Sequence, residues 1–176
     1  MQIEGSCHCG AVRFSAECHT PHPFMHCYCS ICRKTAGGGG YAINIKAEYD
    51  SLQLEGEDHI GSYRAWMDPG RTERSVGERK FCRECGSALW VWDPRWPQMF
   101  HPHASCIDTP LPTPPQTQHF LVEFAPDWVP LPDDSDTCRV HRVAHLPMDE
   151  VIEQMESLDD WHRNRGLWVD LSLIHI

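Results

Sequence analysis

The stretch Cys82-Arg83-Glu84-Cys85-Gly86 is typical of a zinc knuckle, a tight turn in which two cysteines and a following glycine surround a metal ion. The glycine permits the backbone to turn so that its N–H groups point toward the thiolates. Far earlier in the chain lies Cys7-His8-Cys9. The two motifs together supply four sulfurs, enough for a tetrahedral and coordinatively closed site. Because a closed site of this kind stabilises the fold rather than supplying chemistry, we predict a structural zinc bound by Cys7, Cys9, Cys82 and Cys85.

A second cluster, Cys27-Tyr28-Cys29-Ser30-Ile31-Cys32, has three thiols and no fourth cysteine beside them. Three protein ligands with one vacant coordination position describe a catalytic zinc, and the vacancy accepts water or an incoming thiolate. We therefore predict that Cys27, Cys29 and Cys32 are catalytic zinc ligands. Arg33 and Lys34 follow directly, and we expect them either to offset the negative charge of three thiolates on Zn²⁺ or to bind a substrate carboxylate.

The alternative for this cluster is a second structural zinc, with its fourth ligand from Cys106, Cys138 or a histidine. Both cysteines, like Cys18, are isolated in the sequence. An isolated cysteine is more often a small buried hydrophobic residue than a ligand. His26 neighbours the cluster, where it either supports a ligand from outside or acts as a general base.

The composition limits what the chain binds and where it works. Its 176 residues suit one domain plus an appendage. The formal net charge is −10, opposite in sign to that of most nucleic-acid-binding proteins, so we expect no nucleic-acid partner. No apolar run approaches the roughly eighteen residues of a membrane span, and the first residues do not resemble a signal peptide. We therefore expect no membrane association and a reducing, cytoplasmic location, where clustered cysteines bind metal rather than form disulfides.

Short strand-like stretches separated by turn residues predict a mainly β fold. We expect strands at residues 10–14, 41–45, 87–92 and 119–124. The glycine run 37–40 predicts either a tight bend or a place where the backbone approaches a ligand.

The chain changes character after residue 132, and we place a domain boundary there. Residues 133–170 form an acidic extension with apolar residues at helical spacing, so we predict one C-terminal α-helix. The last six residues, 171–176, can be encoded by CTG-TCT-CTT-ATA-CAC-ATC, a string that resembles the mosaic end of the transposon used to make sequencing libraries. We predict that they are a sequencing-adaptor artefact; the alternative is a genuine short apolar tail.

Three motifs resemble those of the glutathione-dependent formaldehyde-activating enzyme (GFA) family, which includes the centromere protein V domain. They are Gly5-Ser6-Cys7-His8-Cys9-Gly10-Ala11-Val12, Cys27-x-Cys29-Ser30-x-Cys32-Arg33-Lys34 and Phe81-Cys82-x-x-Cys85-Gly86-Ser87. Their order and spacing agree with the family, and residues 119–128 resemble its closing segment. The resemblance implies an Mss4-like β-tent of packed antiparallel sheets over a zinc-binding domain at residues 1–132.

The resemblance also implies the activity. The founding reaction joins glutathione and formaldehyde into S-hydroxymethylglutathione, formally a carbon–sulfur lyase reaction. By resemblance, Cys7, Cys9, Cys82 and Cys85 hold a structural zinc and the second cluster holds the active-site zinc, giving two Zn²⁺ per chain. Zinc lowers the pKa of a thiol, so a thiolate exists at neutral pH and can add to a carbonyl. We expect a small thiol or aldehyde-type substrate, with glutathione as co-substrate.

Two features leave alternatives open. The aromatic residues Trp90, Trp92, Trp96 and Phe100 are expected in the core, but if they line the pocket they indicate a substrate larger than formaldehyde. The chain could also be a non-catalytic binding module in which both zinc ions are structural. An open coordination position distinguishes the enzyme from the module, because only the enzyme needs one. The sequence does not set the oligomeric state.

Overall fold

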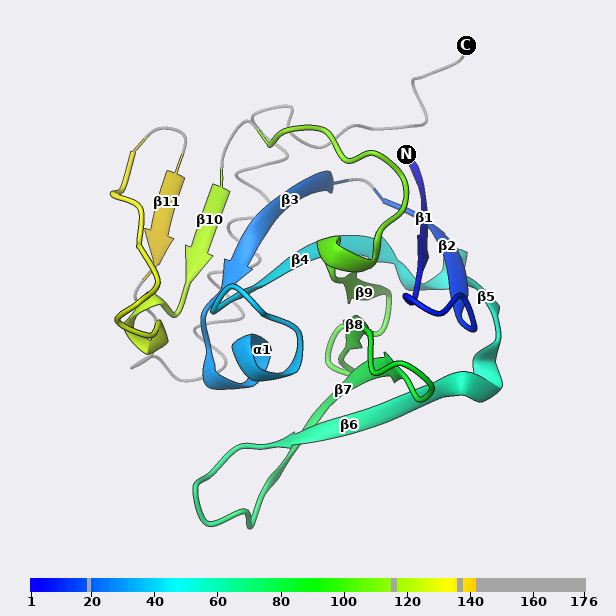
Figure 1. Cartoon of the computed structure of the whole chain (residues 1–176), viewed down its shortest axis with the longest axis horizontal. Helices are drawn as coiled ribbons and strands as arrows, with labels where there is room; N and C mark the ends of the chain where they lie inside the picture. The colour runs from blue at the N-terminus through cyan, green and yellow to red at the C-terminus, as the bar shows by residue number, and fades with distance from the viewer. Residues whose placement is uncertain (19, 115–116, 136–137, 142–176) are drawn as a thin grey trace.

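The computed structural model describes residues 1–18, 20–114, 117–135 and 138–141, and within them the fold is mainly β with one short α-helix (Figure 1). The elements in chain order are β1 (Gln2–Ser6), β2 (Arg13–Glu17), β3 (Thr20–Cys27), α1 (Ser30–Thr35), β4 (Ala42–Glu48), η1 (Tyr49–Ser51), β5 (Gln53–Glu55), η2 (Glu57–His59), β6 (Ile60–Trp66), β7 (Arg74–Cys82), β8 (Ala88–Trp92), β9 (Met99–Pro102), η3 (Ala104–Cys106), β10 (Thr117–Phe120), η4 (Val122–Phe124) and β11 (Cys138–His141).

The strands form two sheets, as the prediction of packed β-sheets requires. One sheet has three strands in the order β1-β2-β5. The other has eight in the order β11-β10-β3-β4-β9-β8-β7-β6. Most neighbours are antiparallel, but β10 runs parallel to both β3 and β11, which the sequence did not predict. The long separation between β3 and β10 in the chain allows this parallel pairing, which a hairpin could not make.

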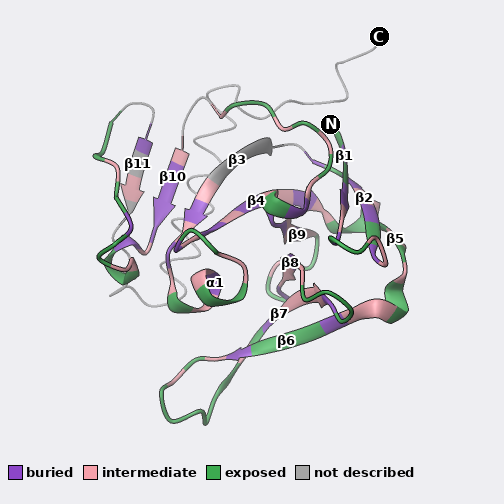
Figure 2. Ribbon diagram, viewed as in Figure 1, coloured by how far each residue is buried: buried purple, intermediate pink, exposed green. Residues whose placement is uncertain are grey.

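The main core lies against the small sheet, whose strands alternate buried and exposed residues as a half-buried sheet requires. Ile3 and Ala16, paired across β1 and β2, are fully buried. Phe14 packs edge-on against Trp90 of the large sheet, with ring centroids 5.4 Å apart, and Phe100 packs on both rings. The buried residues therefore concentrate where the two sheets meet, while β6 and its connection to β7 are largely exposed (Figure 2).

The predicted strands all exist, with shifted ends. The strand predicted at 10–14 begins at Arg13, because Gly10 has a positive φ of +76° and belongs to a turn. The strand predicted at 119–124 ends at Phe120, because Leu121 adopts a left-handed conformation with φ of 59° and starts a 3-10 turn. The strands predicted at 41–45 and 87–92 correspond to β4 and β8.

The β6–β7 hairpin was missed from the sequence. Its strands carry many charged residues, and their alternation is irregular because the register shifts between Arg64 and Trp66. The tip of the hairpin projects beyond the other strands of the large sheet (Figure 1). Near its tip the Arg74 guanidinium lies over the Trp66 ring, 3.7 Å from the centroid.

Two predictions lie outside the described residues. These are the C-terminal helix within 133–170 and the adaptor origin of residues 171–176. The glycine run 37–40 lies within the described residues and forms a tight bend, in which Gly40 N–H donates to the Gly37 carbonyl at 3.1 Å. A side chain at Gly40 would collide with Val129. Among the described residues, no helix has the length and apolar character needed to cross a membrane.

Candidate metal centres and active site

Cys7, Cys9, Cys82 and Cys85 meet at one point although they come from two distant segments. Their four sulfurs lie within 4.8 Å of one another. The Sγ atoms of Cys7 and Cys9 are 3.5 Å apart, and those of Cys9 and Cys82 are 3.8 Å apart. Zinc–sulfur bonds of about 2.3 Å in a tetrahedron separate the sulfurs by about 3.8 Å. The four residues therefore fit a closed tetrahedral metal site.

Two similar turns build this site. Gly10 N–H donates to the Cys7 carbonyl at 3.0 Å, and Gly86 N–H donates to the Cys82 carbonyl at 2.9 Å. Both glycines have positive φ, +76° and +74°, a conformation that residues with a side chain rarely adopt. The turn of the first motif also directs Val12 N–H onto the Cys7 sulfur at 3.2 Å. Backbone donors of this kind stabilise thiolates and so prepare the sulfurs for a cation.

Ser87 connects the two turns. Its Oγ accepts from His8 N–H at 3.1 Å and lies 3.1 Å from the Cys85 sulfur. The hydrogen bond from the Ser87 side chain is the largest of the effects that lower the pKa of the Cys85 thiol to about 5. Cys85 is thus a thiolate at neutral pH even before a metal binds.

Cys27, Cys29 and Cys32 form a second group at the junction of β3 and α1. Their three sulfurs lie within 4.8 Å of one another. Cys27 ends β3, and Cys29 is the N-cap of α1, where its sulfur accepts from Cys32 N–H at 3.3 Å. The short helix exists because this cap satisfies an N-terminal donor and because Arg33 and Lys34 lie in its last turn, where the helix dipole favours cations. The cap and the helix place the three sulfurs together.

The three thiols share negative charge. Hydrogen bonds from Cys27 and Cys32 lower the pKa of Cys29 to about 2. The hydrogen bond to Cys29 raises the pKa of Cys27 well above its usual value. Without a metal the group holds a thiolate stabilised by its neighbours, a donor set that suits a soft, borderline cation such as Zn²⁺.

No fourth ligand completes this group among the histidine, cysteine and carboxylate side chains that the structure describes. Cys106, one predicted candidate, is buried in the main core, and its thiol lies 3.1 Å from the carbonyls of Leu89 and His103. Cys138 is buried on β11 and does not join the group either. In the described part of the chain the group therefore offers three ligands, in contrast to the four of the first site.

Both cysteine groups lie within the part of the chain that matches one protein family. A model of the family described as glutathione-dependent formaldehyde-activating enzyme matches residues 2–123. The chain belongs to this family. A Halomonas elongata protein that carries the name of the GFA family is 51% identical over 168 residues, covering 95% of this chain and 98% of its own. A crystal structure of a Rhodobacter sphaeroides protein from structural genomics is 25% identical, covers 62% of this chain and 91% of its own, and superposes with a TM-score of 0.48.

Within this GFA-family site, the two cations predicted from the sequence differ in environment. Arg33 is half-buried, whereas Lys34 is exposed. The Nε atom of Arg33 is buried and has no hydrogen-bond partner in the part of the chain that the structure describes. A third cation, Arg79 of β7, was not predicted, because it lies in the hairpin whose strands the sequence did not reveal. Its charge acts on Cys32, opposing the rise in the pKa of that thiol.

His26, considered as a general base, lies on the other face of β3 from Cys27, because successive residues of a strand point to opposite faces. Its ring stacks on His119 of β10, with centroids 4.4 Å apart, and contacts Tyr41 edge-on at 5.0 Å. The two histidines are directly paired across β3 and β10. This packing gives His26 a role in joining the strands rather than in proton transfer at the cysteines.

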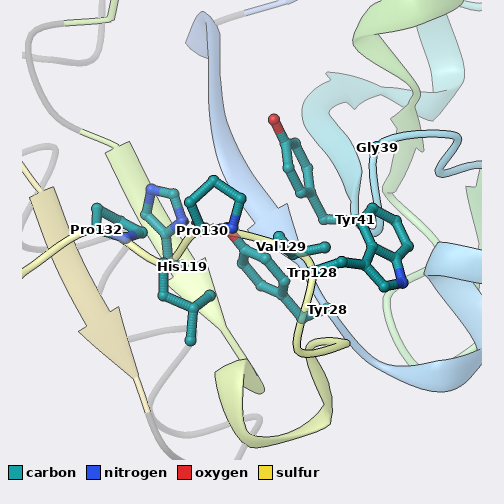
Figure 3. Close-up of a pocket in the computed structure, with 9 residues that line it drawn as sticks. Tyr28, Gly39, Tyr41, His119, Trp128, Val129, Pro130 and Pro132 are labelled. Carbon is teal, nitrogen blue, oxygen red and sulfur yellow. Dashed lines mark hydrogen bonds between the residues drawn. The ribbon is translucent and has the colours of Figure 1, made fainter.

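Tyr28 points to the same face as His26 and lines a cavity of about 470 Å³ (Figure 3). Other residues around this cavity are Gly39, Tyr41, His119 and the segment from Trp128 to Pro132. None of the three cysteines lines it. The cavity is also not lined by the aromatic residues that the sequence suggested for a pocket, Trp90, Trp92, Trp96 and Phe100. Trp90 and Phe100 belong to the core, as expected.

Proposed function

We propose that this protein is a zinc-dependent enzyme that joins a glutathione-like thiol to formaldehyde or a similar small aldehyde, a carbon–sulfur lyase-type activity. The observation that carries the proposal is the contrast between the two cysteine groups. One supplies four sulfurs and the other three, in a chain that belongs to the GFA family. A four-sulfur site is closed to substrate, whereas a three-sulfur site leaves a coordination position for a thiol.

The proposal assigns one zinc to each group, so that the chain binds two. Cys7, Cys9, Cys82 and Cys85 would hold the structural ion, and Cys27, Cys29 and Cys32 the catalytic one. A zinc ion in the second group would lower the pKa of a thiol that binds beside it, so the thiol reacts as a thiolate near neutral pH. The donor set supports zinc in both places, since thiolates favour this ion over magnesium or calcium.

The reaction is an addition that needs no oxidant or reductant. The thiol sulfur forms a bond to the aldehyde carbon, and the π electrons of the carbonyl move to its oxygen. The proton lost by the thiol ends on that oxygen, which gives the hydroxymethyl thioether. The protein contributes by holding the two reactants together, which removes much of the entropic cost of a bimolecular step. Arg33 and Lys34 next to Cys32 are the proposed contacts for an anionic group of the substrate.

The second candidate function is a non-catalytic binding module in which both ions are structural. It requires a fourth protein ligand for Cys27, Cys29 and Cys32, and none of the described side chains supplies one. We therefore favour the enzyme. Its small-molecule partners would be a thiol and an aldehyde, and we propose a cytoplasmic location, where glutathione-like thiols stay reduced.

The test combines metal content with turnover. Elemental analysis of the protein after non-denaturing purification should give about two zinc ions per chain. Mixing the zinc-loaded protein with glutathione and formaldehyde should form S-hydroxymethylglutathione faster than the uncatalysed reaction, measured by NMR. A protein with two zinc ions that leaves this rate unchanged would support the binding module instead.

A further inference from the structure

Arg79 lies on β7 three residues before the knuckle, and its neighbours define where it points. It pairs with Tyr63 on β6 and with Val91 on β8, and Val91 pairs in turn with His101 on β9. Residues directly opposite each other in a sheet share one face, so these four residues form a row on the same face. The adjacent Glu78 points to the opposite face.

The strand register places Arg79 on the same face of the large sheet as the second cysteine cluster. Burial, followed by the charges of Arg79 and His101, lowers the pKa of His103 to about 4. His103 directly follows β9 and bridges Asn44 of β4, and two residues along β4 Ala42 pairs with Cys27 of β3. Residues two apart on a strand share one face, so the face that carries His101 and His103 also carries Cys27. Arg79, in the same row as His101, therefore lies on the sheet face that carries the first cysteine of the three-cysteine group.

Arg79 is half-buried. Its Nε atom is buried without a hydrogen-bond partner among the described residues, a property it shares with Nε of Arg33. The other two arginines of the hairpin's strands are matched: Arg64 donates to Glu78 at 2.8 Å, and Arg74 donates to the Arg64 carbonyl at 2.8 Å. No ion pair of Arg79 is found within the described ranges. A buried guanidinium N–H without an acceptor is costly, so an acceptor is expected from elsewhere.

We propose that Arg79 is a substrate-binding residue of the Cys27/Cys29/Cys32 site and that it binds a carboxylate of the thiol substrate. The planar guanidinium offers its donors in a fork that matches a carboxylate, which a lysine does not. Through Arg79, a thiol that carries a carboxylate would bind more tightly than a neutral thiol. This inference rests on the proposed function, because it assigns the carboxylate to a thiol that reaches the same cysteine group.

The test measures binding rather than turnover. Isothermal titration of the zinc-loaded full-length protein compares glutathione with its diethyl ester, which keeps the thiol but has no free carboxylate. The wild type should bind glutathione about 10- to 100-fold more tightly than the ester, as expected for a charge-assisted hydrogen bond. Arg79→Gln should lose this preference, because the substitution weakens the binding of glutathione and not that of the ester. Its zinc content should be unchanged.

Arg64→Gln is the matched control, because it removes the same charge from the opposite face of the same hairpin and should behave as the wild type. If Arg79→Gln does not fold, Arg79→Lys is the second test. It should weaken the binding of glutathione several-fold and leave the binding of the ester unchanged. Equal binding of the two thiols by the wild type overturns the inference, as does an unchanged preference in the Arg79 variants. Loss of zinc from both variants also overturns it, because Arg79 would then support the metal site.

The outcomes separate this inference from the proposed function. A wild type that binds glutathione more tightly than the ester through Arg79 but does not accelerate its addition to formaldehyde would refute the proposed reaction alone. A wild type that accelerates the addition while the Arg79 variants keep the full preference for glutathione would refute the inference alone.

Discussion

The Tyr28 hydroxyl lies 2.8 Å from Nδ1 of His119, a residue 91 positions later in the chain. Burial is the largest of the effects that raise the pKa of Tyr28 to about 12, so the hydroxyl keeps its proton. The protonated hydroxyl and Nδ1 share a hydrogen bond, and the other ring nitrogen, Nε2, lies 3.2 Å from Thr117 Oγ1. Because Tyr28 lies between Cys27 and Cys29, this bond holds the three-cysteine segment against β10.

Tyr28→Phe tests this connection. The substitution removes the hydroxyl that is hydrogen-bonded to the Nδ1 atom of His119, which should lower the free energy of unfolding by about 1–3 kcal/mol. It should also weaken zinc binding by Cys27 and Cys29 by about tenfold, since the segment that carries them is less firmly held. Chemical denaturation and competition with a chelator measure the two effects. Tyr63→Phe on the exposed hairpin is the control, and equal results for both variants would contradict the role given to Tyr28.

Cys82→Ser should unfold or aggregate the protein. A closed zinc site contributes about 10–16 kcal/mol in zinc-finger peptides, as much as the whole stability of a typical domain. Circular dichroism and size-exclusion chromatography of the purified variant measure the outcome. A variant that folds and elutes like the wild type would show that metal binding by the first cysteine group is not needed for the stability of the fold.

Cys29→Ala should keep the fold and abolish activity, because the three-cysteine group is proposed to serve chemistry rather than stability. The expected result is a melting temperature much closer to that of the wild type than Cys82→Ser gives, with one zinc ion lost per chain. Thermal unfolding and elemental analysis test it together. A loss of stability as large as that of Cys82→Ser would favour two structural sites.

The buried His103 should make stability depend on pH. Burial lowers its pKa in the folded protein to about 4, and Nδ1 lies 2.9 Å from Asn44 Oδ1. In the unfolded chain its pKa is about 6.5, so between pH 6.5 and pH 4 the unfolded state binds more protons. The stability that the neutral His103 contributes to the folded protein is therefore fully present above pH 6.5 and is lost as the pH falls toward 4.

His103→Gln removes this titration. The destabilisation that it causes should be smaller at pH 5 than at pH 7 by about 2 kcal/mol, since the wild type loses that much between the two values. Urea denaturation of both proteins at each pH gives the comparison, in which protonation of the cysteines cancels because both proteins contain them. The same destabilisation at both values would mean that His103 does not titrate in this range.

Deletion of residues 171–176 should leave the melting temperature and activity unchanged within error. A tail encoded by an adaptor has not evolved to contact the rest of the protein, so its removal should break no stabilising interaction. Calorimetry and the glutathione–formaldehyde assay compare the full chain with the shortened one. A clear loss of stability would show that the six residues belong to the natural protein.

The sequence by itself predicted the family, the mainly β fold and the two cysteine groups. It could do so because metal ligands need close spacing and turn glycines, as in Cys82–Gly86, and these features are local. Strand positions were predicted to within a few residues, because the pattern of apolar and turn residues is also local. The ends were misplaced where Gly10 and Leu121 adopt positive φ. The hairpin containing Arg79 was missed because its residues are charged and half-exposed, which gives little periodic signal.

Tertiary structure alone decided which residues surround the second cysteine group. The register from β7 through β8 and β9 to β4 and β3 places Arg79 on the sheet face that carries Cys27. The parallel pairing of β10 with β3 places His119 against Tyr28 and His26. These contacts join residues far apart in the chain, so no local pattern encodes them. The sequence thus determined which side chains can bind metal, whereas the pairing of distant strands decided what charge and which hydrogen bonds those side chains meet, because both depend on distance in space.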